Sequence, residues 1–161
     1  MNKYPLGLIP DSSVIYIPDG AHTSTGVSED EYVHEYNHWH LILQPEDKRK
    51  VRGMAAGLLV AKRKVMAITE LLPEEWADLT NVFATDENGL ADAPRRLAKA
   101  VGAEFTGHFT GPAFNLGSLA GQTQAQVHGH IYPVVAEQLP PPGTRNGMGA
   151  FVEAHRQLNN L

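Results

Sequence analysis

The sequence predicts an α+β fold, with an antiparallel sheet of about five strands and helices packed on one face. Two observations support this class. Short apolar and β-branched runs come in pairs that loops connect. The helical patterns lie between and after these pairs, so strands and helices do not alternate singly as they do in parallel βαβ units.

The first pair of strands is predicted at residues 40–44 and 58–61. Pro45 ends the first run, because proline cannot donate to a β-ladder. The charged segment 45–53 is predicted to be an exposed loop, and contact of its basic residues with a substrate phosphate is the alternative. A further short strand is expected at 14–17, within a turn-rich region.

A helix is predicted to begin at Pro73, because proline suits the first helical turn and the two glutamates that follow favour the positive helix end. Its apolar face is formed by residues at helical spacing, namely Leu72, Trp76, Leu79 and Phe83. Helical structure is expected again over 86–101, broken near Gly89 and by Pro94, with Gly102 as the C-terminal cap.

The length of 161 residues fits one domain, 1–161. Its core is expected at about 38–135, with an N-terminal extension 1–37 and a C-terminal tail or helix 136–161 that includes a helical pattern at 149–158. No stretch is apolar and long enough for a signal peptide or a membrane span, so we expect a cytoplasmic protein without membrane partners.

The composition excludes several function classes. The chain has no cysteine, which removes disulfides, zinc–thiolate and iron–sulfur sites and thiol nucleophiles. The formal net charge of −5 offers no basic surplus for nucleic acid. Histidine is abundant, with eight residues, and is therefore the expected carrier of nucleophilic chemistry.

The most informative strands are the second pair, predicted at 104–110 and 126–135. Because strand side chains alternate, the polar residues of the latter share one face, and these are Gln126, His128, His130 and Tyr132. The segment 115–123 before it is rich in glycine and small residues, which let backbone N–H groups turn toward an anion. This juxtaposition predicts phosphorus chemistry, in which one imidazole attacks and the other hydrogen-bonds the phosphate oxygens.

The stretch from Asn115 to Pro133 resembles the histidine triad superfamily of nucleotide hydrolases and transferases. The family pattern is Asn-x-Gly-x-x-x-Gly-Gln-Ser/Thr, followed by a His-x-His-x-His strand that ends near proline. Upstream, residues 57–64 resemble the family's Leu-Val-Pro-Lys-Arg-His element, and residues 69–79 resemble the helix that follows it.

The resemblance implies cleavage of a nucleoside phosphate derivative at its α-phosphorus, through a covalent nucleotidyl-histidine and without a metal or other cofactor. The substrate would be a phosphoramidate, a dinucleoside polyphosphate or a nucleotide sugar. His128 takes the position of the nucleophile, and His130 that of the histidine that contacts the phosphate. The residues expected to orient the phosphate or leaving group are Gln126, Asn115, Gly121, Gln122 and Thr123. The resemblance also implies a homodimer.

The chain departs from the family pattern at several positions. Gln126 replaces the first triad histidine, and glutamine cannot carry a proton or a positive charge there. Lys64 replaces the histidine of the upstream element, and Arg63 and Lys64 are candidates to replace the lost charge. The altered triad leaves open a non-catalytic module that binds nucleotides.

Two further alternatives come from other histidine patterns. The run His34-Glu35-x-x-His38 matches the zinc-hydrolase motif, which requires a helix. A cupin-type metal barrel also uses His-x-His on a strand, but valines stand where its glutamate is expected.

Overall fold

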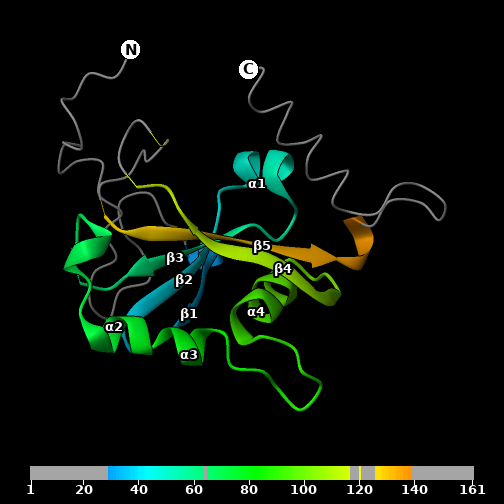
Figure 1. Ribbon diagram of the computed structural model, residues 1–161. Coiled ribbons are helices and arrows are strands. Elements are labelled where there is room, and N and C mark those ends of the chain that lie inside the picture. The colour runs from blue at the N-terminus through cyan, green and yellow to red at the C-terminus, as the bar shows by residue number, and fades with distance from the viewer. Residues whose placement is uncertain (1–28, 64, 117–119, 121–125, 139–161) are drawn as a thin grey trace.

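The computed structural model describes residues 29–63, 65–116, 120 and 126–138. Within them lies a five-stranded antiparallel sheet in the order β1-β2-β3-β5-β4 (Figure 1). The predicted α+β class is confirmed. The strand expected at 14–17 and the helix expected at 149–158 lie outside the described residues. No helix in the described ranges is both long and apolar enough to cross a membrane.

The strands are β1 (Tyr32–Glu35), β2 (Trp39–Leu43), β3 (Gly57–Ala61), β4 (Phe105–Phe114) and β5 (His128–Val135). The helices are α1 (Glu46–Arg52), α2 (Pro73–Ala77), α3 (Leu79–Val82) and α4 (Asp92–Ala100). The strands predicted at 40–44, 58–61, 104–110 and 126–135 correspond to β2, β3, β4 and β5. Strand β1 is an addition, and it pairs with β2, so the sheet begins before residue 38.

The prediction of a loop for the charged segment 45–53 is wrong, because most of this segment forms helix α1. Its acidic residues, Glu46 and Asp47, lie in the first turn, and its basic residues lie in the last turn. This order of charges stabilises the helix dipole at both ends. Lys50 and Glu46 also form an ion pair one turn apart, at 3.4 Å.

The helix predicted from Pro73 begins there but is divided into α2 and α3 at Asp78. The Asp78 carboxylate accepts the backbone N–H of His38 at 2.7 Å, which ties this junction to the start of β2. Leu72 and Trp76 of the predicted apolar face are exposed. The prediction fails for these two because a helix this short turns only part of the expected stripe toward the core.

Pro94 does not break a helix, contrary to the prediction. It is the third residue of α4, where backbone N–H groups have no partner in the helix and proline is tolerated. Gly102 follows the last turn with φ of 69°, as expected of a C-terminal cap. Helix α4 buries Leu97 against the sheet, beside Gly57 of β3.

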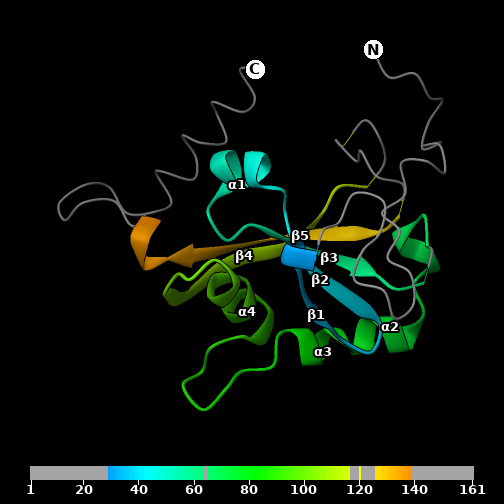
Figure 2. The same cartoon turned by 180° about the vertical axis from the view of Figure 1, so that it is seen from behind.

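The sheet separates two unlike sides of the molecule. Helices α2, α3 and α4 lie on one side and α1 on the other, and the view from behind shows the same arrangement (Figures 1 and 2). The helix-covered face is apolar, with Trp39, Leu41, Leu59 and Ile131 all fully buried. We call the opposite side the histidine face, because β5 presents His128 and His130 there.

Candidate active site on the histidine face

The histidine face is ordered by the strand register. His128 of β5 lies opposite Val60 of β3, and Val60 lies opposite His40 of β2. With neighbouring strands about 4.8 Å apart, the Cα atoms of His40 and His128 are about 10 Å from each other. His130 lies one row further, between Leu58 of β3 and Ala113 of β4. All three histidines are buried, at 6–8% exposure.

His128 is held through its ring nitrogen Nδ1, which lies 2.8 Å from the backbone oxygen of Gln126. Because a carbonyl only accepts, Nδ1 carries the proton and Nε2 keeps its lone pair. Burial lowers the pKa of His128, and the Arg52 cation lowers it further, against the opposing effect of the Gln126 carbonyl. The imidazole is therefore neutral near pH 7, with an unprotonated Nε2.

His130 has two polar neighbours at its own Nδ1. Gln44 Nε2 lies at 2.9 Å and Arg52 Nη1 at 3.3 Å. Burial, followed by the effects of His128 and Arg52, lowers the pKa of His130 to about 4. Its ring centroid is 5.4 Å from that of His128 and 6.0 Å from that of Tyr132, on which it stacks.

Gln126, at the first triad position, is buried and bonded to the backbone. Its amide Nε2 donates to the carbonyl oxygen of Ala61 at 2.5 Å. This bond joins the segment before β5 to the end of β3, beside the backbone bond from Ala61 N to Val127 O. The Gln126 amide, which was predicted to bind a phosphate, thus donates one of its hydrogen bonds to the chain's own backbone.

Asn115 directly follows β4, whose last residue Phe114 pairs with Gly129. The antiparallel register therefore continues from Asn115 toward His128. The other residues expected to hold the phosphate, Gly121, Gln122 and Thr123, lie outside the described residues, as does Lys64.

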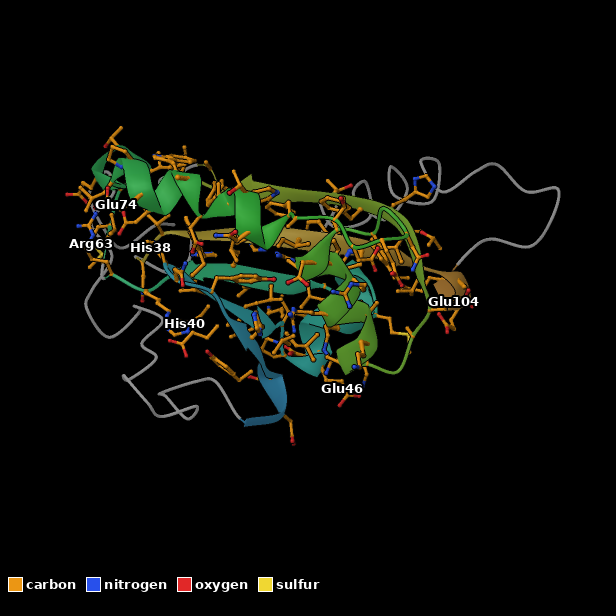
Figure 3. The ribbon with its side chains drawn as sticks, turned by 90° about the horizontal axis from the view of Figure 1, so that it is seen from below. His38, His40, Glu46, Arg63, Glu74 and Glu104 are labelled. Atoms are coloured by element: carbon orange, nitrogen blue, oxygen red, sulfur yellow. The ribbon has the colours of Figure 1, made fainter. Side chains whose placement is uncertain are left out.

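Arg63, a candidate to replace missing charge, is committed elsewhere. Its guanidinium bonds both carboxylate oxygens of Glu75, at 2.8 and 3.0 Å. Figure 3 shows Arg63 with His38 and Glu74 at one end of the molecule, away from Glu46 and Glu104. The hypothesis that Arg63 supplies charge to a phosphate is therefore not supported by its position or its partners.

The zinc-hydrolase motif does not form the helix that it requires. His34 and Glu35 belong to β1, and His38 lies in the connection to β2, so the motif is a hairpin. Among the described residues no group of three or more His, Asp or Glu side chains is arranged to hold a metal ion.

The sequence reasoning did not anticipate Gln44 and Arg52 beside His130. A signal for Gln44 was present, because His40, Ile42 and Gln44 alternate along β2 and its extension. Arg52 belongs to the basic run for which a phosphate contact was only the alternative. Its position depends on helix α1, which the local pattern did not reveal.

The chain is thus an α+β domain with two neighbouring buried imidazoles on one face of its sheet. No protein-family model matches the chain, and no curated protein matches it. Several solved structures are similar to it. The Caenorhabditis elegans NitFhit protein is 26% identical, over 82% of this chain and 27% of that protein, with a TM-score of 0.46. This chain therefore spans about a quarter of that protein's length.

Two other similar structures carry family or activity names. A zinc-bound histidine triad family protein from Mycobacterium smegmatis is 22% identical, over 80% of this chain and 86% of that one, with a TM-score of 0.43. The Plasmodium falciparum diadenosine triphosphate hydrolase, in complex with cyclomarin A, is 19% identical, over 83% and 80%, with a TM-score of 0.46. Structures of histidine triad proteins are thus among those that this chain resembles.

Proposed function

We propose that this chain is an atypical histidine triad protein that cleaves nucleoside phosphate derivatives at the α-phosphorus, as a hydrolase or a nucleotidyl transferase. One observation carries the proposal. His128 Nδ1 donates to the Gln126 carbonyl at 2.8 Å, which leaves Nε2 as an unprotonated nucleophile. The lowered pKa of His128, which results mainly from burial, keeps this form populated at neutral pH.

In the proposed reaction, Nε2 of His128 forms a bond to the α-phosphorus, and the bond from phosphorus to the leaving group breaks. The leaving group departs with the bonding electron pair and takes a proton from solvent. The Gln126 carbonyl stabilises the positive charge that the ring then carries, because Nδ1 stays protonated. Water next attacks phosphorus, loses a proton to solvent and releases the nucleoside monophosphate and neutral His128.

The other site residues have supporting roles in this proposal. His130 donates a hydrogen bond to a phosphate oxygen, and Asn115 approaches from the end of β4. Gly121, Gln122 and Thr123 hold the phosphate or the leaving group. Gln126 helps to orient the same groups of the substrate through the amide N–H and oxygen that its bond to Ala61 does not use. No cofactor enters any step.

The substrate is proposed to be a phosphoramidate, a dinucleoside polyphosphate or a nucleotide sugar, and the protein a cytoplasmic homodimer. Light scattering of the purified protein tests the dimer. A panel with one substrate of each class identifies the leaving group.

The covalent step is tested by incubating the protein with each substrate, quenching in acid-free denaturant and measuring the intact mass. The parent is expected to gain the mass of one nucleotidyl group, and His128→Ala is expected to lose both adduct and turnover. His108→Ala is the matched control, because His108 is an exposed histidine of the edge strand β4. An adduct that persists in His128→Ala, or turnover that does not change, would contradict the proposal.

The alternative of a non-catalytic nucleotide-binding module is favoured by one observation. Gln126 brings no charge to the first triad position, and its amide already bonds Ala61. This alternative predicts nucleotide binding by calorimetry with neither adduct nor turnover on the whole substrate panel. Gln126→His then separates the two functions further, because a gain of turnover would show that only the missing histidine prevents the reaction.

A further inference from the structure

The second imidazole of the site, His130, has two hydrogen-bond donors from the described residues beside its Nδ1 edge. Gln44 Nε2 lies 2.9 Å and Arg52 Nη1 lies 3.3 Å from the same atom, Nδ1. A guanidinium group has no acceptor, and the amide nitrogen of glutamine donates as well. A ring nitrogen that faces two donors must present its lone pair to them, so the proton of the neutral ring lies on Nε2.

We propose that Gln44 and Arg52 are positioning residues that hold His130 as a neutral imidazole with its proton on Nε2, where it can be donated to a phosphate oxygen. His128 is held in the opposite form, with its proton on Nδ1. Although both side chains are imidazoles, His128 is thereby held as a nucleophile and His130 as a hydrogen-bond donor. The inference deepens the proposed function, since it gives two more residues roles in the same site.

The fold builds this arrangement from the connection between β2 and β3. Gln44 is buried, its backbone N–H donates to Ala56 O at 3.0 Å, and its carbonyl accepts Arg49 Nε at 2.8 Å. Arg52 is the last residue of α1, so the helix determines where its guanidinium lies. The arginine brings a fixed positive charge to a triad that has lost one at Gln126.

The described charged and titratable groups that face His130 are few. They are His128 and Tyr132 on its own strand and Arg52 on α1, while its neighbours on β3 and β4 are Leu58 and Ala113. Arg52 lowers the pKa of both histidines, and this effect agrees with the geometry. No described carboxylate faces the ring to favour its charged form.

The test is ¹⁵N NMR of the histidine ring nitrogens, which distinguishes a protonated from an unprotonated nitrogen and does not require turnover. In the parent we expect His130 with a protonated Nε2 and His128 with a protonated Nδ1. The reverse form of His130 would overturn the proposal, because the Gln44 amide would then present Oε1, which is buried without a partner among the described residues.

The variants test which groups determine this form. Gln44→Glu replaces a donor with an acceptor of equal size and is expected to move the proton to Nδ1 and raise the pKa of His130 by about 1–3 pH units. Arg52→Gln provides a second test if Gln44→Glu fails to fold, because Arg52 lies at an exposed helix end. It is expected to raise the pKa of both His128 and His130. Arg52→Lys should retain most of the lowering, and Lys50→Gln on the same helix should change nothing. Unchanged spectra in both Gln44→Glu and Arg52→Gln would overturn the proposal.

The kinetic measurement separates this inference from the proposed function. If the chain is an enzyme, Arg52→Gln is expected to lower kcat by about 10-fold or more, since the wrong ring tautomer disables catalysis. Arg52→Lys should restore part of this loss. If the parent has no activity, the proposed function fails, while the NMR result still decides the inference. A changed spectrum with unchanged kcat would overturn the catalytic relevance of the Nε2 proton.

Discussion

The two faces of the sheet both bury side chains, but they differ in the kind of side chain that is buried. On the helix-covered face, Leu41 and Leu59 fill the space against α4 with apolar side chains. On the histidine face, His40, His128 and His130 are almost as deeply buried, but each is bonded through a ring nitrogen. Both faces contain packed apolar side chains, but the histidine face also buries three polar rings that directed hydrogen bonds hold.

This difference has a thermodynamic consequence. Apolar packing does not depend on pH, whereas a buried imidazole resists protonation because burial penalises its charged form. The histidine face therefore makes the free energy of unfolding depend on pH. The packing of the apolar face contributes the part that does not change with pH. A site that keeps two rings neutral needs such support from the opposite side of the sheet.

The largest effect is expected from removing a fully buried side chain of the apolar face. Leu97→Ala deletes a fully buried side chain of α4 and should lower the free energy of unfolding by about 2–5 kcal/mol. Denaturant unfolding at pH 7 measures it. The matched control is Leu72→Ala, because Leu72 is an exposed leucine and its truncation should change stability by less than about 0.5 kcal/mol. Equal effects of the two changes would contradict the assignment of the core.

The histidine face should lose stability as pH falls. In the folded chain the pKa of His130 is about 4, against the ordinary histidine value of 6.5, so between these pH values the unfolded chain binds a proton that the folded chain does not. The free energy of unfolding should therefore have its full value above pH 6.5. It should fall by up to about 3 kcal/mol as the pH is lowered toward 4. His128, whose pKa is also lowered, adds to the same trend.

Unfolding curves at intervals between about pH 7 and pH 5 measure this slope, in a range above the pKa that carboxylates ordinarily have. His130→Gln should flatten it, and His108→Gln, at an exposed position, should not. A slope that is the same in all three proteins would mean that His130 is not the group that titrates.

Much of the fold followed from local patterns. The alternation of apolar residues predicted β2, β3 and β5, because each strand buries one face against the same core. Pro73 marked a helix start, and Gly102 marked a helix end with positive φ. The prediction failed at α1, where a polar helix has no apolar stripe, and at Trp76, whose exposure depends on where α2 stops.

The site was predictable only in part, because its two kinds of contacts differ in range. That His128 and His130 share a face follows from their spacing alone. Their protonation forms depend on Gln126 O, two residues away, and on Gln44, which comes from a distant strand connection. Pairs so far apart in sequence leave no periodic signal, so the role of Arg52 could be seen only after α1 was placed.

A smaller effect is expected at Gly57 of β3, which packs against Leu97 on the helix-covered face. A Cβ at Gly57 would lie 2.4 and 2.6 Å from the Leu97 methyl carbons and 2.9 Å from the backbone oxygen of Ile42. Gly57→Ala should therefore lower the free energy of unfolding by about 1–3 kcal/mol. Combined with Leu97→Ala, it should add less than this, because both contacts with Leu97 are gone and only the contact with the Ile42 backbone oxygen remains. Full additivity in the double variant would show that the Ile42 oxygen alone sets the penalty.

The smallest effects are expected from two tyrosine hydroxyls, one on each side. Tyr36 donates to Asp92 at 2.7 Å, and Asp92 keeps Arg95 and Arg96 when that hydroxyl is removed. Tyr36→Phe should thus lower the free energy of unfolding by only about 1 kcal/mol and leave the ring resonances of His40, His128 and His130 in place. Tyr32→Phe removes the hydroxyl that lies 3.1 Å from His40 Nδ1 and should cost a similar amount, yet shift the ring resonances of His40. If Tyr36→Phe also moved the resonances of His40, His128 or His130, hydrogen bonds on the apolar side would control the site as well, and the separation of the two faces would be wrong.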